Sequence, residues 1–93
     1  MFYTTNISKM NKIVGDFSLT YYLIKKDEVV EGTICTTFDI EVHKMVDGLV
    51  EKGVCSSVSN DIDKATSILD MLYRNDVLPD TLLEVMEECL EIL

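Results

Sequence analysis

The sequence predicts an α+β domain: a three-stranded antiparallel β-meander followed by two C-terminal α-helices packed on one face of the sheet (β-β-β-α-α). Two patterns of apolar residues lead to this prediction. Over residues 18–58 apolar side chains recur at every second position, which is the period of a strand. After residue 60 they recur at every third or fourth position, which is the period of a helix with one apolar face.

The chain has 93 residues, which is the size of one small domain. Its apolar fraction is 47%, with four Gly and one Pro, and this composition is typical of a folded chain. We place the single α+β domain at residues 18–93. Residues 1–17 show no clear period, and we expect them to form a loosely ordered N-terminal lead-in. A short helix and an added edge strand are the alternatives for this segment.

The first predicted strand covers residues 18–26. Leu19, Tyr21 and Leu23 share one face of it, and large side chains also occupy the alternate positions. Aromatic and branched residues suit a pleated surface. Because both faces carry bulky side chains, we expect this strand to be central in the sheet or covered on both sides.

Residues 33–45 and 50–58 predict a hairpin around the turn signal Asp47-Gly48. The first of these segments alternates between apolar and polar residues, as expected of an antiparallel strand with one solvated face. A three-residue loop would keep the apolar residues of both strands on one face. The pairs expected from this register are Val46 with Val50, Val42 with Val54, and Phe38 with Val58.

This register has one unfavourable consequence. It sets Lys44 opposite Lys52, and like charges directly opposite each other destabilise a pair of strands. A bulge at Gly53 would relieve the repulsion, because glycine inside a strand often marks a bulge.

The first helix is predicted to begin after residue 60. Asn60 is the expected N-cap, and Asp61 and Asp63 fall in the first turn, where the helix dipole favours negative charge. Pro79 lies where the first turn of the next helix tolerates proline. The apolar face of the first helix is formed by Ile62, Ala65, Ile68, Leu69, Leu72 and Tyr73.

The last helix is predicted to run to about residue 93 and to combine a narrow acidic stripe with a wide apolar arc. Burial of one large apolar side chain contributes about 1.5–3 kcal/mol, whereas an acidic residue in the last turn costs only about 0.3–1 kcal/mol. The helix should therefore form despite its charges. The stripe consists of Glu84, Glu87, Glu88 and Glu91, and the arc of Leu82, Leu83, Val85, Met86, Cys89, Leu90 and Leu93.

The charge of the chain excludes several classes of function. The formal net charge is −9, and residues 59–93 hold nine of the 17 acidic residues but two of the eight basic ones. Binding to nucleic acid or to an anionic membrane would need a basic patch, so we expect neither. The N-terminal residues do not form a secretory signal, and the three cysteines are odd in number without CxxC spacing. We expect reduced thiols in a cytoplasm.

The residues that could form a catalytic or a metal-binding site are explained more simply by structural roles. His43 lies near Cys55 across the predicted hairpin and far along the strand from Cys35, and we favour a solvated histidine over a catalytic pair. Asp61 and Asp63 lack the Gly and Glu of a calcium loop, so we interpret them as helix-stabilising residues. We therefore expect no enzymatic activity, no cofactor and no metal site.

Three sequence segments, one in a strand and two in helices, follow one another along the chain. They are "YYLI" (21–24) in a strand, "VSND" (58–61) at the start of a helix, and "LPDTLLEVMEECL" (78–90) in the final acidic helix. This order resembles a family of small uncharacterised proteins, a domain of unknown function from clostridia-like Gram-positive bacteria, over roughly residues 18–93. The resemblance implies a cytoplasmic bacterial protein and brings no activity, cofactor or catalytic residue.

We expect the protein to be a non-enzymatic interaction or regulatory module that uses its acidic helical half, with Glu84, Glu87, Glu88 and Glu91 contacting a basic protein partner. A homodimer is also expected, because the last helix has more apolar surface than one small sheet and one helix cover. The alternatives are an acidic nucleic-acid mimic that inhibits a DNA- or RNA-binding protein, and a small-molecule sensor with Tyr21 or Tyr22 in a pocket.

Overall fold

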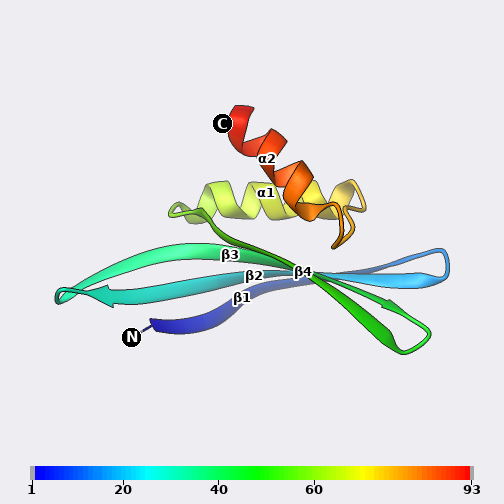
Figure 1. Ribbon diagram of the computed structural model, residues 1–93, viewed down its shortest axis with the longest axis horizontal. Helices are drawn as coiled ribbons and strands as arrows, with labels where there is room; N and C mark the ends of the chain where they lie inside the picture. Colours follow the sequence, from blue (N-terminus) through cyan, green and yellow to red (C-terminus); the bar gives the residue numbers. More distant parts are fainter. Residues whose placement is uncertain (1, 93) are drawn as a thin grey trace.

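The computed structural model describes the backbone of residues 2–92 and the side chains of residues 2–88. A four-stranded antiparallel sheet in the order β1-β2-β3-β4 is followed by two helices that lie on one side of it (Figure 1). The α+β class, the antiparallel meander and the two C-terminal helices on one face are thus confirmed, and the meander has one strand more than expected. The elements are β1 (Phe2–Val14), β2 (Phe17–Val30), β3 (Thr33–Val46), β4 (Leu49–Ser59), α1 (Ile62–Arg74) and α2 (Leu82–Ile92).

The additional strand comes from the segment 1–17, for which an edge strand was one of the alternatives. β1 pairs with β2 from Phe2 opposite Glu28 to Val14 opposite Phe17, with a bulge between Asn6 and Ser8. Most of its side chains are exposed because β1 lies at the edge of the sheet, beside the helices more than under them. A strand that buries so little shows no apolar alternation, and this explains why the sequence pattern did not reveal it.

Two-residue loops join the strands and fix their register. At the β3–β4 loop, Asp47 and Gly48 have φ values of 50° and 78°, the left-handed conformation that a type I′ turn requires. Val46 therefore pairs with Leu49, and the predicted three-residue loop, which pairs Val46 with Val50, is wrong by one residue.

The corrected register changes which side chains face the helices. Val42 lies opposite Gly53, and Val54 lies opposite Glu41 on the face away from the helices. The expected clash of two lysines does not arise, because Lys44 lies opposite Glu51. Cross-strand pairs of opposite charge are favourable.

A bulge late in β4 restores Val58 to the core. The pairing with β3 shifts between the partners of Phe38 and Ile40, and Ser57 has a φ of 53°. The Ser57 N–H donates to Asp39 Oδ1 at 2.7 Å, which holds the bulge. The bulge thus lies at Ser57 and not at Gly53, and it turns Val58 back toward the helices.

Gly53 has a different role from the one expected. A Cβ atom at this position would lie 2.6 Å from the carbonyl oxygen of Pro79, so only glycine allows the α1–α2 connection to approach β4 this closely. Pro79 lies in a turn before α2, and the helix begins at Leu82.

The core lies between the sheet and the two helices. At its centre Tyr21 is fully buried, its hydroxyl donates to the carbonyl of Val77 at 2.9 Å, and its ring packs edge-on against Tyr73. The buried apolar residues are Leu19, Tyr21, Leu23, Phe38, Ile40, Val42, Val58, Ala65, Ile68, Leu69, Leu72, Val77, Leu82 and Met86.

Helix α1 is capped one residue later than expected. The Asp61 side chain accepts from the N–H groups of Asp63 at 2.8 Å and Lys64 at 3.4 Å. Asp61 is thus the N-cap in place of Asn60, and Ile62, which was assigned to the apolar face, is exposed. Asn75 closes the other end by donating through its side chain to the carbonyl of Met71 at 2.7 Å.

Candidate functional site

The predicted acidic stripe lies on the outer side of α2. Leu82 and Met86 are buried against the sheet and α1, and this orientation leaves Glu84, Glu87 and Glu88 exposed. None of these three carboxylates takes part in an ion pair within the part of the chain whose side chains are described. The fourth glutamate of the stripe, Glu91, lies outside the described side chains.

The wide apolar arc of α2 is only partly covered. Leu83 is 60% exposed and Val85 is half-buried, so the sheet and α1 leave these two members of the arc uncovered or partly covered. The remaining members of the arc, Cys89, Leu90 and Leu93, lie outside the described side chains. Apolar surface therefore adjoins the glutamates on the outer side of the helix.

A groove of about 520 Å³ lies where the end of α1 meets α2. Half-buried Met71, Leu78 and Val85 supply apolar lining, and Asp76 and Glu88 supply carboxylates. Such a groove suits the aliphatic stem of a lysine or arginine whose charged head reaches the carboxylates.

Lys12 of β1 already neutralises one of these carboxylates. Its Nζ lies 2.5 Å from Asp76 Oδ1, donates to the carbonyl of Tyr73 at 2.9 Å, and lies 4.5 Å from the centre of the Tyr73 ring. Glu88 has no such cation among the described residues. Of the two carboxylates that line this groove, the one left for a partner is therefore Glu88 on α2.

The comparison with family models decides which family the chain is part of. A model described as "Family of unknown function (DUF6514)" matches residues 2–91. The chain belongs to this family. The expected membership of a family of unknown function is thus confirmed, and the match extends beyond residues 18–93 to include β1. Comparison with curated proteins and with solved structures gave no significant match.

In this DUF6514 member, the histidine and the described cysteines do not come together. His43 lies opposite Lys52 on the face away from the helices, whereas Cys55 lies opposite Ile40 on the core face. Burial raises the pKa of the Cys55 thiol, and the charge of Asp39 raises it further, so the thiolate is disfavoured. Cys35 is exposed near the β2–β3 turn.

His43 instead belongs to a charged cluster on the open face of the DUF6514 sheet. Glu41 Oε1 lies 3.0 Å from His43 Nε2 and 3.3 Å from Lys52 Nζ, and the ring of Tyr22 packs 4.7 Å from the imidazole. Burial alone would raise the pKa of Glu41. The hydrogen bonds and charges of His43 and Lys52 outweigh this effect and hold the pKa below its ordinary value.

Sequence reasoning missed this cluster because it depends on the register of β4. Part of the signal was visible, since Glu41 and His43 are two residues apart on one strand and must share a face. Lys52 joins them only in the register that the two-residue turn imposes. Together with Asn6 and Ile24, the side chains of Tyr22, Glu41 and His43 line a shallow depression of about 260 Å³.

Tyr21 and Tyr22, the two candidate ligand contacts of a small-molecule sensor, lie on opposite faces of β2. Tyr21 is fully buried, and its hydroxyl donates a hydrogen bond to the carbonyl of Val77. Burial raises the pKa of Tyr21 to about 12, and the nearby Asp76 and Tyr73 add to the shift. Tyr22 is half-buried on the open face, under the Nζ of Lys9 at 5.8 Å from its ring centre.

Over the described residues, no three acidic, histidine or cysteine side chains are close enough to hold a metal ion together. Among the described helices, none has the length and apolar character needed to span a bilayer.

Proposed function

We propose that this protein is a non-enzymatic interaction module that binds a basic segment of another protein through its helical half. The observation that carries the proposal is the position of Glu84, Glu87 and Glu88, which are exposed and lack ion-pair partners in the described region. They lie on the same helix as the half-buried Val85 that lines the α1–α2 groove.

The physical basis is a combination of charge and apolar contact. Unpaired carboxylates attract a basic segment from a distance and speed its association, and this attraction weakens as salt is added. Affinity then requires apolar contact, which Met71, Leu78 and Val85 offer to the stems of long basic side chains.

A binding role is also supported by the separation of the reactive groups. His43 and Cys55 lie on opposite faces of the sheet, and the Cys55 thiol is held in its neutral form. Cys55 therefore has no histidine beside it that would make it a nucleophile, and His43 contacts the carboxylate of Glu41 instead.

The cellular setting belongs to the same proposal. We place the protein in the cytoplasm of a Gram-positive bacterium. An odd number of cysteines without paired spacing suits a reducing compartment, and the resemblance described above implies this source.

The test is affinity capture from bacterial lysate with quantitative mass spectrometry, at low and at high salt. We expect wild-type protein to retain one or more basic proteins at low salt and to lose them at high salt. The variant in which Glu84, Glu87 and Glu88 are each changed to Gln should fail to retain them, because the stripe has lost its charge.

A matched control removes the same charge from the sheet. Glu28, Glu31 and Glu51 are exposed on β2, the β2–β3 turn and β4, and changing each to Gln should leave capture unaltered. The proposal is overturned if the α2 variant retains the same proteins as wild type, or if both variants lose them equally.

A further inference from the structure

The outer edge of β1 lacks a partner strand in the described structure. β1 is the first strand in the order β1-β2-β3-β4 and pairs only with β2 among the described strands. β4 forms the other edge of the sheet, and the α1–α2 connection packs on its helix-facing side at Gly53. An unpaired edge presents a row of amide and carbonyl groups to any extended chain that can reach it.

The turn between β1 and β2 determines which groups face outward. Val14 and Phe17 flank the two-residue loop 15–16, so they exchange backbone hydrogen bonds. In an antiparallel pair, bonded and non-bonded positions then alternate along the strand, and the register is regular from Ser8 to Val14. The odd-numbered residues in this stretch therefore direct their N–H and C=O groups away from β2. They are Lys9, Asn11 and Ile13.

The usual protections of an edge strand are weak over this stretch. Natural edges are often blocked by lysines, prolines or bulges. The bulge of β1 precedes Ser8, so it leaves the following residues in regular pairing. The two lysines fold onto the faces of the sheet: Lys9 lies over the Tyr22 ring, and Lys12 bonds to Asp76 and the carbonyl of Tyr73.

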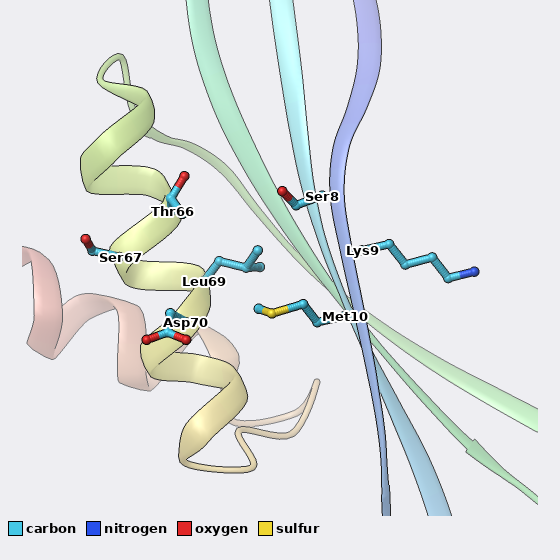
Figure 2. A pocket seen from close by; sticks show the side chains of 7 residues that line it. All are labelled: Ser8, Lys9, Met10, Thr66, Ser67, Leu69 and Asp70. Carbon is cyan, nitrogen blue, oxygen red and sulfur yellow. The ribbon is translucent and has the colours of Figure 1, made fainter.

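A groove of about 520 Å³ runs beside this edge, between β1 and α1. Figure 2 shows Met10 of β1 and Leu69 of α1 pointing toward one another across it, with Thr66 farther along the helix and Lys9 turned the opposite way. A strand added to β1 would extend the sheet at this point and place alternate side chains against α1.

We propose that the occupant of this edge is β1 of a second copy of the chain. The two strands pair antiparallel about a two-fold axis and join the two four-stranded sheets into one continuous sheet. The inference does not rest on the proposed function of the acidic helices.

Charge complementarity identifies a second copy as the partner. The strand β1 contains Lys9 and Lys12 and no acidic residue, although the whole chain has a net charge of −9. The helix beside the groove carries Asp63 and Asp70. Among the four strands, β1 is the one without an acidic residue, so a second β1 can approach this acidic flank without bringing carboxylates against it.

Repulsion between lysines also determines the register in which the two β1 strands pair. Centring the two-fold axis on Asn11 pairs all three outward residues and sets Lys9 opposite Ile13 of the second copy. Centring it on Lys9 or on Lys12 would set two lysines opposite each other, which is unfavourable. Centring it on Met10 would place Ile13 opposite the bulge and shorten the pairing.

The open face of the sheet is a poorer dimer interface. Its centre carries the ion cluster of Glu41, His43 and Lys52. Covering these charges with a second copy would remove them from water, and the cost of that desolvation often exceeds the gain from pairing.

The test is sedimentation velocity of the purified full-length protein over a wide concentration range. We expect wild type to reach about twice the chain mass of 10.5 kDa. Lys9→Pro removes an outward N–H without touching the β1–β2 bonds and should weaken the dimer at least about tenfold, since each interface loses two hydrogen bonds.

Lys52→Pro is the matched control, because Lys52 is the equivalent outward-facing lysine on β4, the other edge. Its dimer should remain as strong as wild type, and circular dichroism should show that both variants fold. The proposal is overturned if wild type stays at 10.5 kDa at high micromolar concentration, or if Lys9→Pro dimerises as wild type does.

A cross-linking experiment tests the register and does not depend on proline. In a background with Cys35, Cys55 and Cys89 changed to Ser, Asn11→Cys should form a disulfide-linked dimer under mild oxidation, because the axis brings the two sulfurs together. Lys52→Cys should form no disulfide-linked dimer under the same conditions, although it still associates through β1. Equal cross-linking of the two variants would contradict the proposed edge.

Discussion

The carbonyl of Pro79 lies directly against the backbone of Gly53, where a Cβ atom would be 2.6 Å from the oxygen. This contact joins the α1–α2 connection to the edge strand β4, and it involves backbone atoms that cannot move aside as a flexible side chain can. The position of α2, and therefore of its acidic stripe, depends on the absence of a side chain at residue 53.

Gly53→Ala is expected to destabilise the protein by about 1–3 kcal/mol, because the added methyl group forces backbone to shift in a packed region. Urea unfolding followed by circular dichroism measures the free energy of unfolding. The control is Lys52→Ala on the neighbouring exposed position, which should change it by less than about 1 kcal/mol. A Gly53→Ala variant as stable as wild type would show that the connection moves freely.

Tyr21→Phe is expected to cost about 1–3 kcal/mol, because it leaves the buried carbonyl of Val77 without its donor. Tyr22→Phe on the opposite face is the control, and we expect a change within about 0.5 kcal/mol. Chemical denaturation of both variants in parallel gives the comparison. Equal effects would mean that the Tyr21 hydroxyl contributes nothing beyond its ring.

Stability should fall at alkaline pH through Tyr21. The pKa of Tyr21 is raised from 10.0 to about 12 by burial and by the nearby Asp76 and Tyr73, so the folded protein holds this proton longer than the unfolded chain does. This contribution is complete below the unfolded pKa and is lost as the pH rises through the folded one. The measurement is the free energy of unfolding of wild type and Tyr21→Phe at a series of pH values. The slope above pH 10 should be smaller in the variant, and identical slopes would contradict the assignment.

Asp61→Ala is expected to destabilise the protein by about 1 kcal/mol, because the first-turn N–H groups of Asp63 and Lys64 lose their acceptor. Asn60→Ala should have an effect within about 0.5 kcal/mol, since Asn60 is exposed and is not the cap. Thermal unfolding of the two variants distinguishes them. The reverse order of stabilities would restore Asn60 as the N-cap.

The alternation of side chains allowed much of the fold to be predicted. Leu19, Tyr21 and Leu23 share the core face of β2 as expected, and Phe38, Ile40 and Val42 share that of β3. These residues are buried under two helices, so their period is strong. β1 escaped detection because an edge strand with exposed faces has no such period, even though Met10 reaches the core.

The register of β4 shows what a local pattern leaves open. Val54 and Val58 are four residues apart and look like members of one face, but the bulge at Ser57 lies between them and places them on opposite faces. The spacing of apolar residues in the sequence shows neither the turn conformation at Asp47 nor the hydrogen bond from Ser57 to Asp39.

The candidate site could be predicted in part. The exposure of Glu84, Glu87 and Glu88 follows from helical spacing, because the buried Leu82 and Met86 fix the orientation of α2. The groove beside them could not be predicted, since it depends on how the irregular segment between the two helices folds.

The Ser57 bulge also limits how this chain can change length in evolution. The bulge gives β4 two more residues than β3 between the pairs Ile40–Cys55 and Phe38–Ser59. Removing one of them would shift the following side chains by one position, turn Val58 toward solvent and rotate the start of α1 away from the sheet. Insertions and deletions should therefore accumulate at the exposed tips of the hairpins, where an altered loop leaves the packed residues in place. A single-residue deletion between Cys55 and Val58 should be as damaging as the loss of a large core side chain.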